Sequence, residues 1–190
     1  MIRLRLILSL MLSIFLALPA TAQSVLDRFL PQVDAAALVS GADGFGPVRD
    51  DIPVVPVMSG GDRIGWAFIT SDFVGTTGYS GRPIHTMVAV DDDARVTGVQ
   101  LVHHDEPIVL IGIPESRVRK LVEDYAGLDL IAEAESGGTA HELEIISGAT
   151  VTVMVIDDSI TRSGVRVARI LGLGGVEPDA APAGPQYEID

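Results

Sequence analysis

Two hydroxyl residues flank a pair of small residues at Ser147-Gly148-Ala149-Thr150, just before the longest run of helical periodicity in the sequence, residues 151–171. Small residues let a ligand or another backbone approach closely, and the free N–H groups of a helix N-terminus favour a phosphate. These residues alone leave two readings open. One is a phosphate-binding turn, and the other, commoner one is an ordinary helix start capped by Ser147 or Thr150.

The other polar residues form no standard catalytic or metal-binding pattern. His103 ends a predicted strand and His104 follows it; if the strand continues through His104, the two side chains point to opposite faces and are not expected to share an ion. The run from Asp91 to Asp93 is typical of a solvated hairpin tip, because a calcium site needs further spaced oxygen ligands. The chain has no cysteine, and neither a nucleophile elbow nor a P-loop is present. We therefore expect no catalytic residue and no metal.

The elements that must position these residues are strands in the middle of the chain and helices around them. Strands are expected at an irregular edge, residues 52–58, and at 63–70, 83–90, 96–103 and 142–146. Residues 91–95 are turn-like and predict an antiparallel hairpin. Helices are expected at residues 24–39, with Pro31 kinking or splitting the first, and at 115–125 and 151–171. The fold class is therefore α+β, an antiparallel sheet with packed helices.

The two ends of the chain differ in composition from its middle. Residues 1–22 have a short basic region, an apolar run and a small-x-small site before Gln23, which predicts a secretory signal peptide. Residues 172–190 are rich in Gly, Ala and Pro and carry four acids and no base, which predicts a linker. One domain over residues 23–171 remains between them.

The charge of the chain excludes one class of partner. The formal net charge is −13, and loss of Arg3 and Arg5 with the signal peptide would make it −15. Such an excess of acid repels phosphate backbones, so we expect no nucleic-acid binding.

Ser147-Gly148-Ala149-Thr150 resembles the S-G-A-T flavinylation motif of the FMN-binding domain family, which includes the C subunit of the sodium-pumping quinone reductase and the G subunit of the Rnf complex. The family's motif begins with Asp six residues before the threonine, where this chain has Glu144. More narrowly, the chain resembles the N-terminal periplasmic domain of the NosR/NirI group. Four segments carry this likeness, residues 66–72, 78–83, 103–115 and 145–163.

The resemblance implies a cofactor and the residues that hold it. An ApbE-type flavin transferase would join the phosphate of FMN to Thr150 as a phosphoester, with Ser147, Gly148 and Ala149 forming the turn. The same resemblance places Gly78, Tyr79, Ser80 and Glu106 near the cofactor. For Tyr79, flavin contact and core packing are both open, and for Glu106 a structural hydrogen bond is the commoner role.

The resemblance also implies a role outside the cytoplasm. We expect a periplasmic flavoprotein of electron transfer that supports nitrous oxide reductase in denitrification, possessing no self-contained enzyme activity. Members of the group continue into transmembrane helices and cysteine-rich ferredoxin motifs, so the expected partner is such a part or a separate membrane redox protein. The alternatives are a non-catalytic exported module that holds FMN or docks onto a membrane redox complex, and a relative of the ion-pumping subunits.

Overall fold

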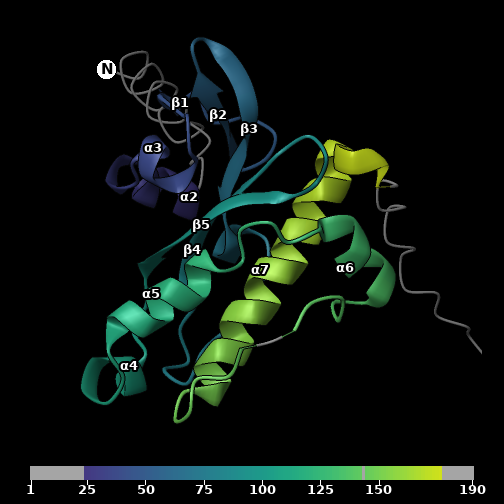
Figure 1. Ribbon diagram of the computed structural model, residues 1–190. Helices are drawn as coiled ribbons and strands as arrows, with labels where there is room; N and C mark the ends of the chain where they lie inside the picture. The colour runs from purple at the N-terminus through teal and green to yellow at the C-terminus, as the bar shows by residue number, and fades with distance from the viewer. Residues whose placement is uncertain (1–23, 143, 177–190) are drawn as a thin grey trace, which may run out of the picture.

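The computed structural model describes residues 24–142 and 144–176. Five strands form one antiparallel sheet in chain order: β1 (Gly44–Phe45), β2 (Val54–Ser59), β3 (Asp62–Ile69), β4 (His85–Val90) and β5 (Val96–His103). The helices are α2 (Val25–Phe29), α3 (Ala35–Leu38), α4 (Pro107–Ile111), α5 (Glu115–Glu123), α6 (Leu130–Ser136) and α7 (Thr150–Leu171). The expected α+β class, an antiparallel sheet with packed helices, is confirmed (Figure 1).

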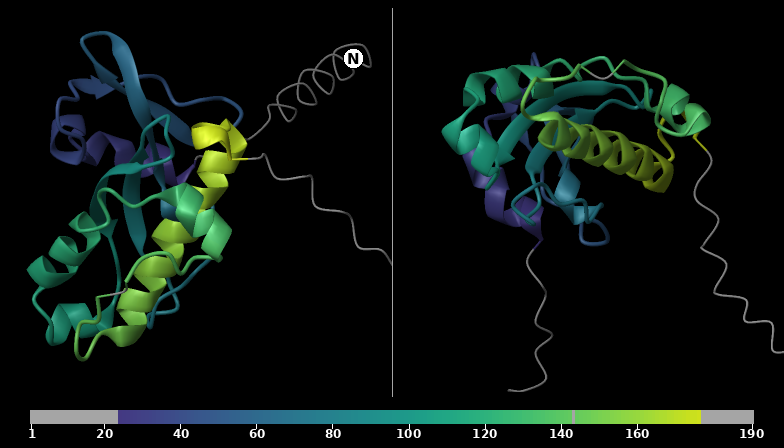
Figure 2. Two further views of the ribbon diagram at one scale, coloured as in Figure 1. Left: turned by 45° about the vertical axis from the view of Figure 1, so that its right-hand side comes forward. Right: turned by 90° about the horizontal axis from the view of Figure 1, so that it is seen from below.

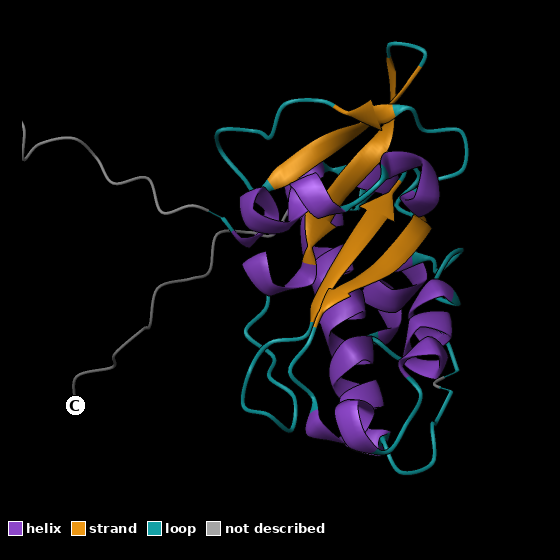
Figure 3. Cartoon of the chain, turned by 90° about the vertical axis from the view of Figure 1, so that its left-hand side faces the viewer, coloured by secondary structure: helices purple, strands orange, loops and turns teal. Residues whose placement is uncertain are grey.

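The sheet is covered by helices on both faces (Figures 2 and 3). Alternate residues of the strands belong to two separate buried clusters, as the two-residue period of a strand requires. Phe68 and Val88 pack on the side of α5, α6 and α7, whereas Ala67 and Met87 pack on the side of α2 and α3. The sheet therefore supports two cores, of which the larger holds α7.

The hairpin of β4 and β5 is found at the predicted residues. Asp91 stabilises its tip, because its carboxylate accepts hydrogen bonds from the backbone N–H groups of Asp93 and Arg95, at 3.0 and 2.8 Å. Ala94 completes the turn with a positive φ of 60°. The acidic run at this tip is therefore a turn that faces solvent, as its composition predicts.

Among the remaining elements, the break expected at Pro31 is found, and two features differ from the prediction. Pro31 splits the expected helix 24–39 into α2, a 3₁₀ turn (Leu30–Gln32) and α3. The expected edge strand 52–58 is β2, which is not at the edge because the two-residue β1 pairs with its outer side. The helices α4 and α6 are additional elements.

The predicted strand at residues 142–146 is wrong. The described residues of this segment pair with no strand, and Glu142, Glu144 and Ile145 are exposed. Of the described residues in this segment, only Ile146 is buried, in the larger core. A strand needs a partner along its length, and this segment instead follows α6 and leads to the start of α7 (Figure 1).

The predicted signal peptide, residues 1–22, lies outside the described residues. The predicted linker is described only as far as Val176. There Leu173 is buried and the N–H of Gly174 donates to the carbonyl of Asp92 at 2.8 Å, so the first residues after α7 still pack on the hairpin tip. Among the described residues, no helix is both long and apolar enough to cross a membrane.

Candidate functional site: a pocket at the start of helix α7

The S-G-A-T turn forms the N-terminus of α7. Ala149 is the N-cap residue and Thr150 is the first helical residue, and no side chain caps this end of the helix. The capping role expected for Ser147 or Thr150 is therefore wrong, because the helix begins one residue too early for Thr150 to cap it. The side chain of Thr150 is exposed instead, so its hydroxyl is available to a reaction partner.

The turn before α7 leaves space that a larger side chain would close. Gly148 has a φ of +86°, a conformation that L-residues rarely adopt, and a Cβ there would meet only Ile113 Cδ1, at 3.9 Å. Ala149 is buried, and its N–H donates to the carbonyl of Ile146 at 2.9 Å. Glycine is thus required by the backbone, and Ile146 ties the turn to the core.

The helix end favours an anion. The N–H groups of the first helical residues, Thr150, Val151 and Thr152, have no carbonyl four residues earlier within the helix to bond. These groups and the macrodipole of a 22-residue helix carry partial positive charge. A phosphate beside Thr150 would meet these donors.

A second segment reaches the same place from another part of the chain. The residues between the 3₁₀ turn Thr70–Asp72 and β4 include Gly78, Tyr79 and Ser80, and the N–H of Gly81 donates to the carbonyl of Gly78 to close a tight turn. This turn holds Tyr79 at the surface, with 76 % of its area exposed. Core packing, one of the two roles considered for Tyr79, is therefore wrong.

Glu106 ties the two segments together. Its carboxylate is completely buried and accepts three hydrogen bonds: from the N–H of Tyr79 at 3.0 Å, from the N–H of Ser80 at 3.1 Å and from the hydroxyl of Thr152 at 2.8 Å. Burial alone would raise the pKa of Glu106, but these donors favour the charged form and leave the pKa below its ordinary value. Glu106 is thus a buried anion that links the Tyr79 turn to the first turn of α7.

Gly78 is needed for this link. A Cβ at residue 78 would lie 2.1 Å from Glu106 Oε1 and 2.5 Å from its carboxyl carbon. No side chain can occupy that space while the carboxylate keeps its three donors. The glycine therefore lets the turn backbone approach the acid closely enough for the N–H groups of Tyr79 and Ser80 to donate.

Together the segments line a surface pocket of about 340 Å³, a size within the usual range of ligand sites. Its lining residues are Tyr79, Gly148, Ala149, Thr150, Val151 and Thr152. The structure thus brings four of the predicted site residues into one pocket. Of the others, Glu106, Gly78 and Ser80 support it from behind, and Ser147 lies in the exposed turn before it.

Exposed apolar side chains lie near this end of α7. Val151 and Met154 on the helix and Ile145 before it are about half exposed, while Leu110 and Ile111 of α4 are more so. Helix α4 and the start of α7 lie at the same end of the molecule (Figures 1 and 2). A planar, partly apolar ring joined through a short chain to a phosphate fits such a site, because the ring has Tyr79 and aliphatic groups to contact and the phosphate has the helix N-terminus. The residues present therefore fit FMN.

Thr152 is the functional residue that the motif alone does not reveal. Its hydroxyl holds Glu106 from within α7, and it also lines the pocket. A threonine two positions inside a predicted helix would ordinarily be assigned to packing, so only its distance to Glu106 identifies it.

Comparison with known proteins agrees with this site. Residues 78–163 match the FMN-binding domain family. The protein NirI of Paracoccus denitrificans is 37% identical over 176 residues, which cover 90% of this chain and 25% of NirI. The regulatory protein NosR of Stutzerimonas stutzeri is 34% identical over 167 residues, or 86% of this chain and 22% of NosR. The chain thus spans about a quarter of the length of these relatives.

A more distant relative is covered over most of its length. The G subunit of the ion-translocating oxidoreductase complex of Aliivibrio fischeri is 27% identical over 152 residues, which cover 74% of this chain and 70% of that relative. The matched family segment begins at Gly78 and ends at Ser163, and so contains the whole pocket. Residues 78–163 therefore belong to the FMN-binding domain family, in a chain related over most of its length to NirI and NosR.

Proposed function

We propose that the chain is an exported electron-transfer flavoprotein that carries FMN as a phosphoester on Thr150. The observation that carries this proposal is the position of the Thr150 hydroxyl, exposed at an uncapped helix N-terminus in a pocket shared with Tyr79. A covalent bond suits a protein outside the cytoplasm, because a cofactor that dissociates there is lost by diffusion. FMN supplies the redox chemistry when bound, and the protein supplies attachment, orientation and electrostatics.

Each residue of the pocket has a defined task in this proposal. Thr150 Oγ1 provides the ester oxygen, and the first N–H groups of α7 stabilise the remaining phosphate charge by about 0.3–1 kcal/mol. Tyr79 provides a ring surface for the isoalloxazine. Glu106 keeps Tyr79 and α7 in register, because it accepts hydrogen bonds from both segments.

The attachment can be tested by mass. The chain is expressed together with a flavin transferase, denatured and filtered, and the retained chain is measured by intact mass spectrometry and flavin absorbance. We expect the mass of the wild type to rise by one FMN minus one water. Thr150→Ala should abolish the added mass, and Thr150→Ser, which keeps a hydroxyl, should restore it.

A matched control separates attachment from misfolding. Thr139 is also an exposed threonine, but it lies in the loop after α6, so Thr139→Ala should retain the full added mass. Thermal unfolding of all three variants should resemble that of the wild type. Covalent flavin on the Thr150→Ala chain, or none on the wild type, would overturn the assignment.

The physiological role that we propose follows NosR and NirI. The chain would lie in the periplasm and pass electrons toward nitrous oxide reductase or support its activity, with an ApbE-type transferase and a membrane redox protein as partners. Support comes from the two relatives, which are 37% and 34% identical over most of this chain. Loss of nitrous oxide reduction in cells that carry Thr150→Ala, with rescue by the wild type, would be the expected result.

A second candidate is favoured by one observation. The similarity to the G subunit of an ion-translocating complex covers 70% of that relative, so the chain could serve such a complex as its FMN-bearing component. The two candidates predict different partners. Affinity purification of the tagged chain from membranes should retain a redox protein of denitrification in the first case and other components of an ion-translocating complex in the second.

A further inference from the structure

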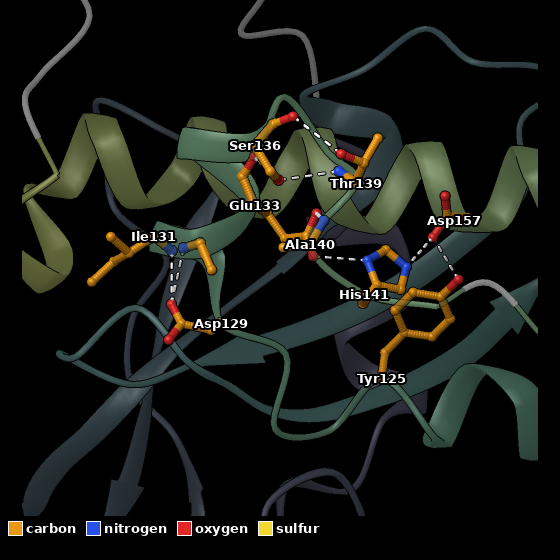
Figure 4. Close-up of polar contacts among 10 residues, drawn as sticks. Tyr125, Asp129, Ile131, Glu133, Ser136, Thr139, Ala140, His141 and Asp157 are labelled. Carbon is orange, nitrogen blue, oxygen red and sulfur yellow. Dashed lines mark hydrogen bonds and ion pairs between the residues drawn. The ribbon is translucent and has the colours of Figure 1, made fainter.

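A partly buried histidine, His141, is held between two carboxylates beside α7, with 20% of its side chain exposed. Nδ1 of His141 lies 2.8 Å from Glu133 Oε1, and Nε2 lies 2.7 Å from Asp157 Oδ1. The hydroxyl of Tyr125 donates to the same oxygen of Asp157 at 2.8 Å. Figure 4 shows these four side chains meeting between α6, α7 and the loop that joins them. None of them lines the pocket at Thr150.

The three charged groups come from three different segments. Glu133 belongs to α6 and is 1 % exposed, Asp157 belongs to α7, and His141 belongs to the connecting loop, residues 137–149. Glu133 also accepts a hydrogen bond from the N–H of Ala140 at 3.3 Å. The cluster therefore fastens the first part of this loop to both helices.

The fastened loop leads directly into the S-G-A-T turn. Of the residues described between His141 and the turn, Glu142, Glu144 and Ile145 are exposed and Ile146 is buried. We call the exposed residues Glu142, Glu144 and Ile145 the strip before Thr150. It is attached at one end by the His141 cluster and at the other by Ile146. A flavin transferase that acts on Thr150 must approach the exposed residues next to it, so the placement of this strip would affect the rate of attachment.

Both contacts of His141 require a donor. A carboxylate only accepts hydrogen bonds, and only the protonated imidazole carries N–H on both nitrogens. The neutral ring can donate to Glu133 or to Asp157, and then turns a lone pair toward the other carboxylate. The facing groups are Glu133 from α6, Asp157 from α7 and the Tyr125 hydroxyl after α5, so two of the three are acidic.

We propose that His141 is a positioning residue for flavin attachment, which in its protonated form holds the 137–149 loop so that the strip before Thr150 is presented to the transferase. This inference rests on the proposed function. His141 does not touch the cofactor. It acts through the loop, and loss of its proton releases one of the two helices.

The pH dependence follows from the environment of the ring. Burial alone would lower the pKa of His141, but the hydrogen bonds and charges of Glu133 and Asp157 outweigh it and raise the pKa above its ordinary value. Because the pKa of His141 is higher in the folded chain than in the unfolded chain, the protonated ring stabilises the fold fully below the unfolded pKa of about 6.5. This stabilisation is lost as pH rises through the folded pKa. The loop should therefore be held below about pH 6.5 and should loosen as pH rises above that through the folded pKa of His141.

The test compares attachment rates in vitro across pH. Ester formation needs an activated donor, and FAD supplies one: the Thr150 oxygen forms a bond to the FMN-side phosphorus, the phosphoanhydride bond breaks, AMP leaves, and the hydroxyl proton passes to solvent. We expect the wild type to be flavinylated about tenfold faster than His141→Gln below about pH 6.5, and the ratio to fall toward one as pH rises. Because both rates are measured with the same transferase at the same pH, the ratio of the wild-type rate to the His141→Gln rate is free of the pH dependence of the transferase.

A matched variant tests a histidine outside the cluster. His103 lies on β5, stacks against Phe29 and His85 on the other face of the sheet, and is exposed. His103→Gln should give a rate ratio near one at every pH. A wild-type to His141→Gln ratio that stays near one, or that is large but independent of pH, would overturn the proposal, since a merely structural role predicts the second result.

A second readout does not depend on flavin. Hydrogen exchange of the Ala140 amide in the flavin-free chain should be slower in the wild type than in His141→Gln below about pH 6.5, and the difference should shrink at alkaline pH. If the wild type accepts no covalent flavin, the proposed attachment fails. The loop-holding role is refuted separately if the difference in Ala140 exchange between the wild type and His141→Gln does not change with pH.

Discussion

At the scale of single residues, the site depends on a buried carboxylate that is not among the residues lining the pocket. Glu106 contacts two backbone N–H groups of the Tyr79 turn and one hydroxyl of α7, and it is completely buried. A buried charge is stabilising only when donors surround it. The same donors therefore fix the relative position of Tyr79 and Thr150, which lie in segments about seventy residues apart.

Replacing Glu106 by Gln tests this role. The amide has the same shape but places an NH₂ group where one carboxylate oxygen accepted a hydrogen bond, so at least one donor is left facing another donor. We expect the free energy of unfolding to fall by about 1–3 kcal/mol, measured by chemical denaturation. Glu123→Gln, at an exposed position of α5, should change it by less than about 0.5 kcal/mol. Equal stabilities of the two variants would contradict the role.

The same carboxylate predicts a dependence on acid. The pKa of Glu106 is lowered in the folded chain, so its contribution to stability is present above the unfolded value of about 4.3 and is lost as pH falls through the lower folded value. The difference in unfolding free energy between wild type and Glu106→Gln should therefore be constant near neutral pH and diminish below about pH 4.3. A difference that grows on acidification would refute the charged assignment.

At the scale of elements, one glycine lets the N-terminal helices approach the sheet. A Cβ at Gly98 of β5 would lie 1.8 Å from the carbonyl oxygen of Leu38, the last residue of α3. Because the obstacle is backbone, the clash cannot be relieved by rotating a side chain. Gly98→Ala should therefore destabilise the chain by about 1–3 kcal/mol or more, measured as a lower midpoint of denaturation.

Gly75 provides the matched control for this substitution. Nothing lies within 4 Å of a Cβ at Gly75, and its φ is outside the left-handed region. Gly75→Ala should therefore leave stability within about 0.5 kcal/mol of the wild type. A similar loss in both variants would mean that the cost comes from the alanine itself and not from the contact with α3.

The elements differ in how well the sequence predicts them. The hairpin of β4 and β5 could be predicted because its strands alternate, its turn residues are acidic and both patterns are local. Helix α7 could be predicted because its apolar residues recur over 22 positions. The site motif is equally local, so Thr150, its glycine and the neighbouring small residues can be found without the structure.

Other features depend on contacts that the sequence does not display. Residues 142–146 have a strand-like composition, but those of them that the structure describes pair with no strand. The helix α6 does have local signals: the Asp129 side chain accepts hydrogen bonds from two backbone N–H groups at its start, and Gly137 ends it. It has only seven residues, however, and so shows too little periodicity to be predicted. The contact of His141 with Glu133 and Asp157 joins residues 8 and 16 positions apart, and only the fold brings them together.

At the scale of the whole molecule, the two cores are joined by more than the sheet. The carboxylate of Asp72 accepts hydrogen bonds from the N–H groups of Val25 and Leu26 at 2.8 and 2.7 Å, at the start of α2. The carbonyl of the next residue, Phe73, accepts one from the guanidinium of Arg166 on α7 at 2.7 Å. Residues 72 and 73 therefore connect the helices on opposite faces of the sheet.

This connection predicts that the N-terminal helices α2 and α3 unfold together with the layer that contains α7. Leu26 is completely buried in the smaller core, so Leu26→Ala should lower the unfolding free energy by about 2–5 kcal/mol. Hydrogen exchange should show α7 losing protection by the same amount as β3, because the strand backbone serves both cores. A separate, earlier transition of residues 25–38, with α7 still protected, would show that the two layers are independent. Since α7 carries Thr150 at its first residue, cooperative unfolding would make a packing defect far from the pocket lower the yield of the proposed flavin attachment as well.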